Sequence, residues 1–348
     1  MLDHWRRCAI LTASQRLPHA TRRTAMRSPT PGTDAPIIRT EGLTKQFGQE
    51  FAVRDVSFEV PAGKIFGFIG PSGSGKTTTV RMLTGFYAPT AGRATVLGHS
   101  PAEFGVSIRQ KIGYMPQQFA LYPTLTVWEN LNFAASIYGM PFQRQARLNE
   151  LLEFVQLAEH KRKLARNLSG GMKRRLSLAA TLVHSPTLLF LDEPTAGIDP
   201  VLRHHFWQHF RHLQDEGRTL FVTTQYVGET AYCDLVGVMV QGRLLAVDTP
   251  GGLRRRAFAG EMVHLYTQER LTHKDLLSLA ELPFVHSKPS RLDDEHGICL
   301  VVDRADTAIP PLMEWCRREY VTVQSIEEYL PPFDEVFMKL VQETPADE

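Results

Sequence analysis

The amino-acid sequence predicts an α/β fold, followed by a small α+β module. Short apolar runs such as 64–69 and 187–191 alternate with segments of helical apolar spacing, which is typical of an α/β domain. A glycine-rich stretch joins the first of these runs to a helix expected at 77–84, and this strand–loop–helix order opens many α/β domains. After 249–252 the composition shifts, and a second alternation of strands and helices begins.

Length and composition are those of a globular protein with more than one domain. The chain has 348 residues, of which 43% are hydrophobic and 22% charged, and its formal net charge is +2. Because this charge is small, no nucleic-acid partner is expected. The four cysteines show no metal-like pairing and are expected to be free thiols. No apolar run approaches the ~20 residues that span a bilayer, so work at a membrane would need a partner.

Three regions follow from the shifts in composition. Residues 1–36 form an arginine-rich tail, which is expected to be disordered or to precede a true start at Met26. Residues 37–248 form the α/β domain, which contains a helical subdomain at about 118–168. Residues 249–348 form the accessory module.

Local patterns predict further elements of the α/β domain. Segments 37–40, 51–53 and 56–60 are expected to be strands, and the last of them alternates as a half-buried strand does. Thr126 and Glu129 have the spacing of a capping box, so a helix is expected to begin there. From this point to the end of the helical subdomain, the chain is expected to be almost wholly helical.

The accessory module is predicted to have the element order βαββαβ, which suits a ferredoxin-like fold. Strands are expected at 262–267, 284–287, 299–302 and 321–326, and helices at 274–282 and 309–318. A last helix is expected at 333–341.

The glycine-rich stretch fits the phosphate-loop pattern G-x-x-x-x-G-K-[ST] between a strand and a helix. It consists of Gly70, Pro71, Ser72, Gly73, Ser74, Gly75, Lys76 and Thr77. Glycines let successive backbone N–H groups turn toward a phosphate at a helix N-terminus. Lys76 would reach the β- and γ-phosphates, and the Thr77 hydroxyl would bind Mg²⁺.

A pair of acids, Asp192 and Glu193, ends the apolar run at 188–191. Adjacent carboxylates at the carboxyl edge of a buried strand are costly unless they meet a cation. We expect Asp192 to hold Mg²⁺ and Glu193 to act as the general base that polarises the attacking water. An ordinary strand end is the alternative, and the phosphate loop argues against it.

A third motif, Leu168-Ser169-Gly170-Gly171-Met172, precedes a basic helix. Ser169 is a good N-cap, and the two glycines allow a backbone to approach an anion closely. Together with the phosphate loop and the acid pair, this motif resembles the signature of ABC-type ATPases, in their usual order and spacing over 37–247. The resemblance implies a P-loop NTPase core with an antiparallel β subdomain and a helical subdomain, which hydrolyses ATP with Mg²⁺.

The resemblance also assigns residues outside these motifs. It implies that Ser169, Gly170 and Gly171 bind the ATP of a second copy. It also implies that Thr78, directly after the phosphate loop, binds ATP. Phe47 matches the aromatic that stacks on adenine, although a core role is an alternative. Gln117 matches the glutamine that contacts the Mg²⁺ site and relays to the membrane partner, although it could be a solvated loop residue. Asp199 matches the loop that crosses the dimer seam.

The chain departs from the family at two positions. Gln225 stands where the family usually has a histidine that contacts the γ-phosphate. A glutamine can donate a hydrogen bond to phosphate but cannot become a cation near neutral pH. We therefore expect hydrolysis to continue through Glu193, at a reduced rate. Met172 replaces a common glutamine, with little consequence expected.

The resemblance extends to the export branch of ABC transporters, through residues 121–131, 137–139 and 333–340. It implies a homodimer that drives an integral membrane permease from the cytoplasmic face of the cell membrane. Two alternatives remain at this point: a soluble ABC ATPase acting on ribosomes or nucleic acid, and a regulatory cassette with little turnover. One cassette without a cysteine cluster or sustained heptads disfavours the first, and Glu193 disfavours the second.

Overall fold

The computed structural model describes residues 35–292 and 296–342. The tail expected at 1–36 therefore lies almost entirely outside the described residues. The described chain divides into two compact units. One contains Gln118–Pro186, and the other contains Ile37–Gln117 with the described residues from Thr187 onward. None of the described helices is long and apolar enough to cross a membrane.

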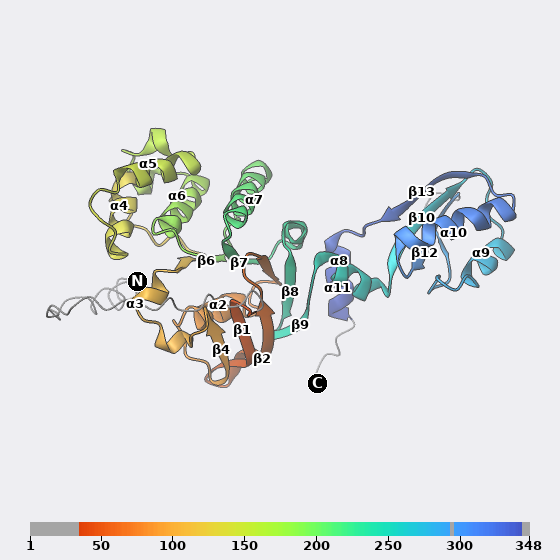
Figure 1. Ribbon diagram of the computed structural model, residues 1–348, viewed down its shortest axis with the longest axis horizontal. Coiled ribbons are helices and arrows are strands. Elements are labelled where there is room, and N and C mark those ends of the chain that lie inside the picture. The colour runs from red at the N-terminus through yellow and green to blue at the C-terminus, as the bar shows by residue number, and fades with distance from the viewer. Residues whose placement is uncertain (1–34, 293–295, 343–348) are drawn as a thin grey trace, which may run out of the picture. The chain divides into compact units, whose positions relative to one another are not determined.

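A six-stranded sheet forms the centre of the larger unit, in the order β5-β6-β7-β3-β8-β9. Strands β6, β7, β8 and β9 are labelled in Figure 1. All neighbouring pairs are parallel except β8 and β9. The strands are β3 (Ile65–Ile69), β5 (Ile112–Met115), β6 (Leu188–Asp192), β7 (Thr219–Thr224), β8 (Leu235–Val240) and β9 (Arg243–Asp248). Strands β3, β6 and β7 are buried at every residue, as expected for the inside of a parallel sheet. The predicted α/β fold is confirmed.

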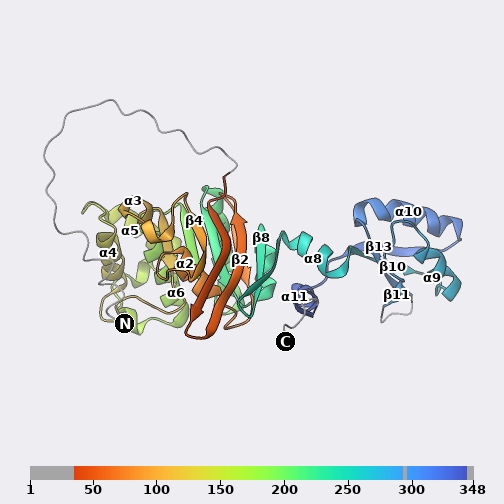
Figure 2. The same cartoon turned by 90° about the horizontal axis from the view of Figure 1, so that it is seen from below.

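A second, antiparallel sheet has the order β2-β1-β4, and its three strands are labelled in Figure 1. Figure 2 shows the same sheet from below, with β2 and β4 labelled. Its strands are β1 (Ile38–Phe47), β2 (Glu50–Val60) and β4 (Ala91–Val96). The prediction of separate strands at 51–53 and 56–60 is wrong, because both belong to β2. Asp55 lies between them with a φ of 49°, and the pairing with β1 shifts its register in the same region. This kink lets both Val53 and Val56 point into the core, which breaks the alternation of a regular strand.

Five phenylalanines join the two sheets in one core cluster. Phe58 of β2 stacks on Phe66 of β3 with ring centroids 5.3 Å apart, and Phe66 stacks on Phe221 of β7 at 5.2 Å. Phe68 and Phe190 also pack against Phe221. These buried rings pack β2 against β3, β6 and β7 in one rigid core.

The smaller unit is built on α4 (Val127–Ile137), α5 (Gln145–Phe154) and α6 (Gly170–Leu182). The predicted capping box is confirmed: the Thr126 hydroxyl accepts from the Glu129 N–H, and the Glu129 carboxylate accepts from the Thr126 N–H. The prediction of an almost wholly helical segment up to 168 is wrong. Gln156 has a φ of 56°, which ends α5, and only the short 3₁₀ turns η2 (Ala158–His160) and η3 (Ala165–Asn167) follow.

The C-terminal residues form a four-stranded antiparallel sheet in the order β11-β12-β10-β13. Its elements run as β10 (Glu261–Thr267), α9 (His273–Ala280), β11 (Ser290–Arg291), β12 (Gly297–Val302), α10 (Ala305–Arg318) and β13 (Val323–Tyr329). The central β10 and β12 connect through a helix and a hairpin, which is the split βαβ order of a ferredoxin-like fold. The predicted βαββαβ order is confirmed.

Two boundaries in this module were predicted wrongly. The strand expected at 284–287 makes only an isolated bridge, from Val285 to Val302, and the paired strand is β11. Helix α10 begins at Ala305, before the expected start at Ile309, because the Glu261 carboxylate accepts a hydrogen bond from the Ala305 N–H.

Two further helices flank the C-terminal sheet in sequence. They are α8 (Pro250–Phe258) and α11 (Phe333–Gln342), and they pack against each other. Helix α11 also contacts η4 (Val227–Tyr232), the turn that follows β7.

Candidate functional site

The predicted phosphate loop connects β3 to α2 (Lys76–Leu83). Gly75 precedes the helix with a φ of 103°, and no side chain caps this helix end. A Cβ at Gly75 would collide with the Ala52 carbonyl oxygen and lie 2.6 Å from Cε of Met239. The backbone therefore turns sharply at a residue without a side chain, and the first-turn N–H groups of α2 face the loop. This is the geometry of an anion site at a helix N-terminus.

Lys76 lies inside this loop with 5% of its side chain exposed. Its Nζ donates to the carbonyl oxygens of Gly70 at 2.8 Å and Pro71 at 3.0 Å. It also lies 3.4 Å from Oε1 of Glu193. Burial lowers the pKa of Lys76, and the nearby Glu193 charge partly offsets this. The lysine is thus held by groups that a phosphate could replace.

Asp192 is fully buried at the end of β6. Its Oδ1 accepts hydrogen bonds from the hydroxyls of Thr77 at 3.1 Å and Thr223 at 2.6 Å. Its Oδ2 is buried and has no hydrogen-bond partner among the described residues. A buried carboxylate oxygen without a partner is costly unless a cation satisfies it. The carboxylate and the Thr77 hydroxyl are hard oxygen donors, which fit Mg²⁺.

Glu193 follows Asp192 in a left-handed conformation, with a φ of 50°. Its N–H is shared between the hydroxyl and the carbonyl oxygen of Thr223, at 3.0 Å and 3.1 Å. Its Oε2 accepts from the Gln225 N–H at 3.3 Å. Burial raises the pKa of Glu193, and the Lys76 charge partly offsets this. A carboxyl group with a raised pKa, held in a strained loop, is suited to proton transfer.

The structure therefore brings Lys76, Thr77, Asp192 and Glu193 together, and the Gln225 backbone joins them. The Gln225 side chain is exposed. Phe47 is 45% exposed at the end of β1, and its ring packs edge-on against Tyr87 at 5.3 Å.

Other predicted residues lie in local structures of their own. Gln117 is exposed two residues after β5. Asp199 caps α7 (Pro200–Asp215) by accepting from the Leu202 N–H at 2.9 Å. In the smaller unit, Ser169 caps α6 by accepting from the Met172 N–H at 3.3 Å, and Gly170 is the first residue of that helix.

Sequence reasoning missed two residues beside the acid pair. Thr223 pairs with Asp192 across β6 and β7 and binds it through the side chain. Tyr114 of β5 has its pKa raised to about 12 by burial, with the Asp192 charge as the next cause. A threonine at the carboxyl end of a buried strand was the available signal for Thr223. Nothing local in the sequence indicated Tyr114.

Comparison with known proteins agrees with this geometry. A model of the ABC transporter family matches residues 53–196. The linearmycin resistance ATP-binding protein of Bacillus subtilis is 32% identical over 313 residues, which are 89% of this chain and 100% of that protein. The daunorubicin/doxorubicin resistance ATP-binding protein of Streptomyces peucetius is 34% identical over 89% of this chain and 94% of its own length.

Coverage is smaller for a longer relative. The probable multidrug ABC transporter ATP-binding protein of Escherichia coli is 41% identical over 232 residues, which are 66% of this chain. The chain spans 39% of the length of that protein.

Solved structures share the fold. An ATP-binding subunit of an ABC transporter superposes with a TM-score of 0.59 at 27% identity, covering 63% of this chain and 92% of its own. The ADP conformation of an ATP-binding cassette of an ABC transporter has a TM-score of 0.54 at 27% identity, covering 62% of this chain and 91% of its own. Since the Bacillus protein is 32% identical and the match extends over 100% of its length, the chain belongs to the ABC transporter family, among its ATP-binding proteins.

Proposed function

We propose that the chain is the ATP-hydrolysing subunit of an exporter, in which two copies close around two ATP molecules and drive a membrane permease. The observation that carries the proposal is the cluster in which Lys76 lies 3.4 Å from Glu193 and Thr77 lies 3.1 Å from Asp192. These four side chains come from the carboxyl ends of β3 and β6 or the helix start beside them, where α/β sheets bind their ligands.

Within this cluster, Lys76 would bind the β- and γ-phosphates. Its ammonium now donates to the carbonyl oxygens of Gly70 and Pro71 and pairs with the Glu193 carboxylate, and a triphosphate would compete for the same positive charge. Glu193 would then be free to accept a proton from the attacking water, as its raised pKa favours. Thr77 and Asp192 would hold Mg²⁺, which neutralises phosphate charge that develops during transfer.

The remaining predicted residues would act between subunits. Ser169, Gly170 and Gly171 would bind the γ-phosphate held by the second copy. Ser169 is the N-cap of α6, and a helix N-terminus is suited to binding anions. Asp199 would lie at the seam between copies. Gln117 would pass the state of the nucleotide to the permease. The protein would act at the cytoplasmic face of the membrane through that partner.

Export is favoured by the names of the relatives. These include resistance proteins against linearmycin and against daunorubicin and doxorubicin, and proteins for Nod factor export from Ralstonia and Burkholderia. Each name describes the relative, and together the names support export of a cargo by this chain.

The 249–348 module is proposed to be a separate accessory domain.

The variant Glu193→Gln tests the proposal directly. It keeps the side-chain shape but removes the base, so ATP turnover should fall by about 100-fold or more. ATP binding should persist, and saturating ATP should shift the protein to a dimer in sizing chromatography. Glu103→Gln, at an exposed position, is the control and should behave as wild type. Unchanged turnover in Glu193→Gln, or a monomer under saturating ATP, would contradict the proposed function.

A further inference from the structure

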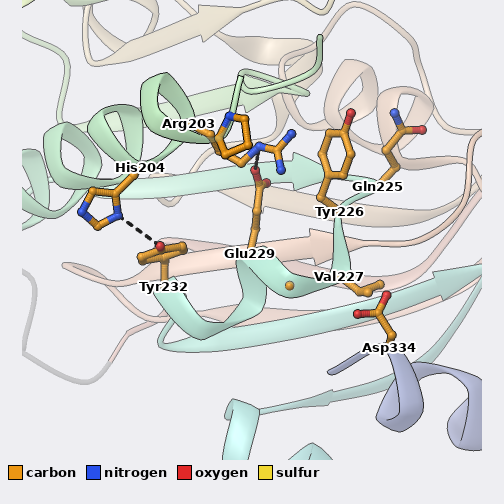
Figure 3. Close-up of a pocket in the computed structure, with 10 residues that line it drawn as sticks. Arg203, His204, Gln225, Tyr226, Val227, Glu229, Tyr232 and Asp334 are labelled. Carbon is orange, nitrogen blue, oxygen red and sulfur yellow. Dashed lines mark hydrogen bonds and ion pairs between the residues drawn. The ribbon is translucent and has the colours of Figure 1, made fainter. Parts of the chain in front are cut away.

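Glu229, a buried carboxylate that belongs to none of the recognised motifs, lies four residues after Gln225 in the sequence and lines the same cavity. Glu229 of η4 is 3% exposed, and it lines a cavity of ≈ 450 Å³ together with Arg203 and Tyr226 (Figure 3). The loss of hydration at such a group must be offset by specific partners. Its partners therefore show what it holds in place.

The first partner is the loop that follows the acid pair. Oε1 of Glu229 accepts a hydrogen bond from the Thr195 hydroxyl at 2.7 Å. Thr195 is fully buried and lies two residues after Glu193. Within the described residues, Oε2 of Glu229 is buried without a hydrogen-bond partner. The Thr195 hydroxyl therefore fixes the position of the Oε1 atom of this carboxylate.

The second partner is helix α7. The Arg203 Nε forms an ion pair with Oε1 of Glu229 at 3.5 Å, and another guanidinium nitrogen of Arg203 donates to the Ile198 carbonyl oxygen at 3.5 Å. The same guanidinium lies 4.1 Å from the ring centroid of Tyr226. Figure 3 shows these two side chains next to each other. Such a cation–π contact ties Arg203 to the residue directly after Gln225.

These contacts join three segments around one carboxylate: the loop at 193–199, the start of α7 and the residues at 225–226. Two of the segments carry groups of the ATPase site, since the Gln225 N–H binds Oε2 of Glu193. A buried network with few partners holds one geometry, because breaking one contact leaves a charge unpaired.

We infer that Glu229 is a positioning residue for ATP hydrolysis, which fixes the Glu193 loop relative to Gln225 through Thr195 and Arg203. The inference rests on the proposed function. It differs from the roles of the motif residues, since Glu229 acts only through other side chains. Misplacement of a catalytic group by about 1 Å can cost about 100-fold in rate.

The test measures the steady-state kinetics of the full-length protein with Thr195→Val, Thr195→Ser and Glu229→Gln. Thr195→Val keeps the volume but removes the hydroxyl, so kcat should fall by about 10-fold or more, while the KM for ATP stays within about 2-fold. Thr195→Ser keeps the hydroxyl and should retain wild-type kcat. Glu229→Gln keeps an oxygen that can accept from the Thr195 hydroxyl but removes the charge that pairs with Arg203, so it should also lower kcat by about 10-fold or more.

Thr230→Val is the matched control. Thr230 is 1% exposed in η4, and its hydroxyl donates to the Val227 carbonyl oxygen outside the network. It should keep wild-type kcat although it also loses a buried hydroxyl. Wild-type kcat in Thr195→Val, an equal loss in Thr195→Ser or Thr230→Val, or a raised KM with unchanged kcat would overturn the inference. A wild-type protein without turnover would instead contradict the proposed function itself, and the inference with it.

Discussion

The phosphate loop offers a matched pair of glycines, Gly75 and Gly73, for which the structure predicts different costs of substitution. Both have positive φ, 103° and 79°, so an alanine at either position pays about 1–2 kcal/mol for the left-handed backbone. A Cβ at Gly75 also meets Ala52 and Met239, whereas a Cβ at Gly73 has nothing within 4 Å. Such overpacking costs about 1–3 kcal/mol more, so Gly75→Ala should be destabilised by about 2–5 kcal/mol.

Urea unfolding of nucleotide-free protein measures this difference. The midpoint for Gly75→Ala should lie below that for Gly73→Ala, with equal m-values, since both variants expose the same surface on unfolding. Gly75→Ala should also weaken ATP binding, because relief of the clash moves the start of α2. If both alanine variants unfolded at the same urea concentration, the steric reasoning at the start of α2 would be refuted.

Two further predictions concern Asp192 and its neighbour Tyr114. Burial raises the pKa of Tyr114 to about 12, whereas a tyrosine in the unfolded chain titrates near 10. The folded protein therefore favours the neutral tyrosine, and the stability that this gives below pH ~10 should be lost as the pH rises toward 12. The two-unit gap is worth about 3 kcal/mol, and Tyr114→Phe should remove this loss in alkaline unfolding curves. Asp192→Asn should abolish the gain in ATP affinity on adding MgCl₂, measured by titration; an unchanged magnesium effect would argue against Asp192 as the ligand.

Motifs defined by adjacent residues were predicted well. The turn at 70–77 depends on glycines and on the helix that follows, all within one short segment. The capping box of Thr126 and Glu129 depends on two residues of one helical turn, and it forms as predicted. The βαββαβ order of the accessory module followed from alternating apolar runs.

Predictions failed where a neighbouring segment or an unusual backbone angle intervened. Gln156 ends α5 in a left-handed conformation that glycine or asparagine normally signals. Asp55 joins two apparent strands into β2 through a kink, again at a residue that is not glycine. Neither angle can be read from residue type alone, since surrounding contacts stabilise it.

The sequence by itself determined that this chain carries a phosphate loop, a paired acid and a signature loop, because each motif is local. Only the folded chain set the 3.4 Å contact of Lys76 with Glu193 and the bond from Thr223 to Asp192. These groups lie on strands and loops far apart in sequence, and the order β6-β7-β3 brings them together. Strand order depends on packing of the whole sheet, so no pattern along the chain specifies it. The Glu229 network arises in the same way, from three segments that meet only in the fold.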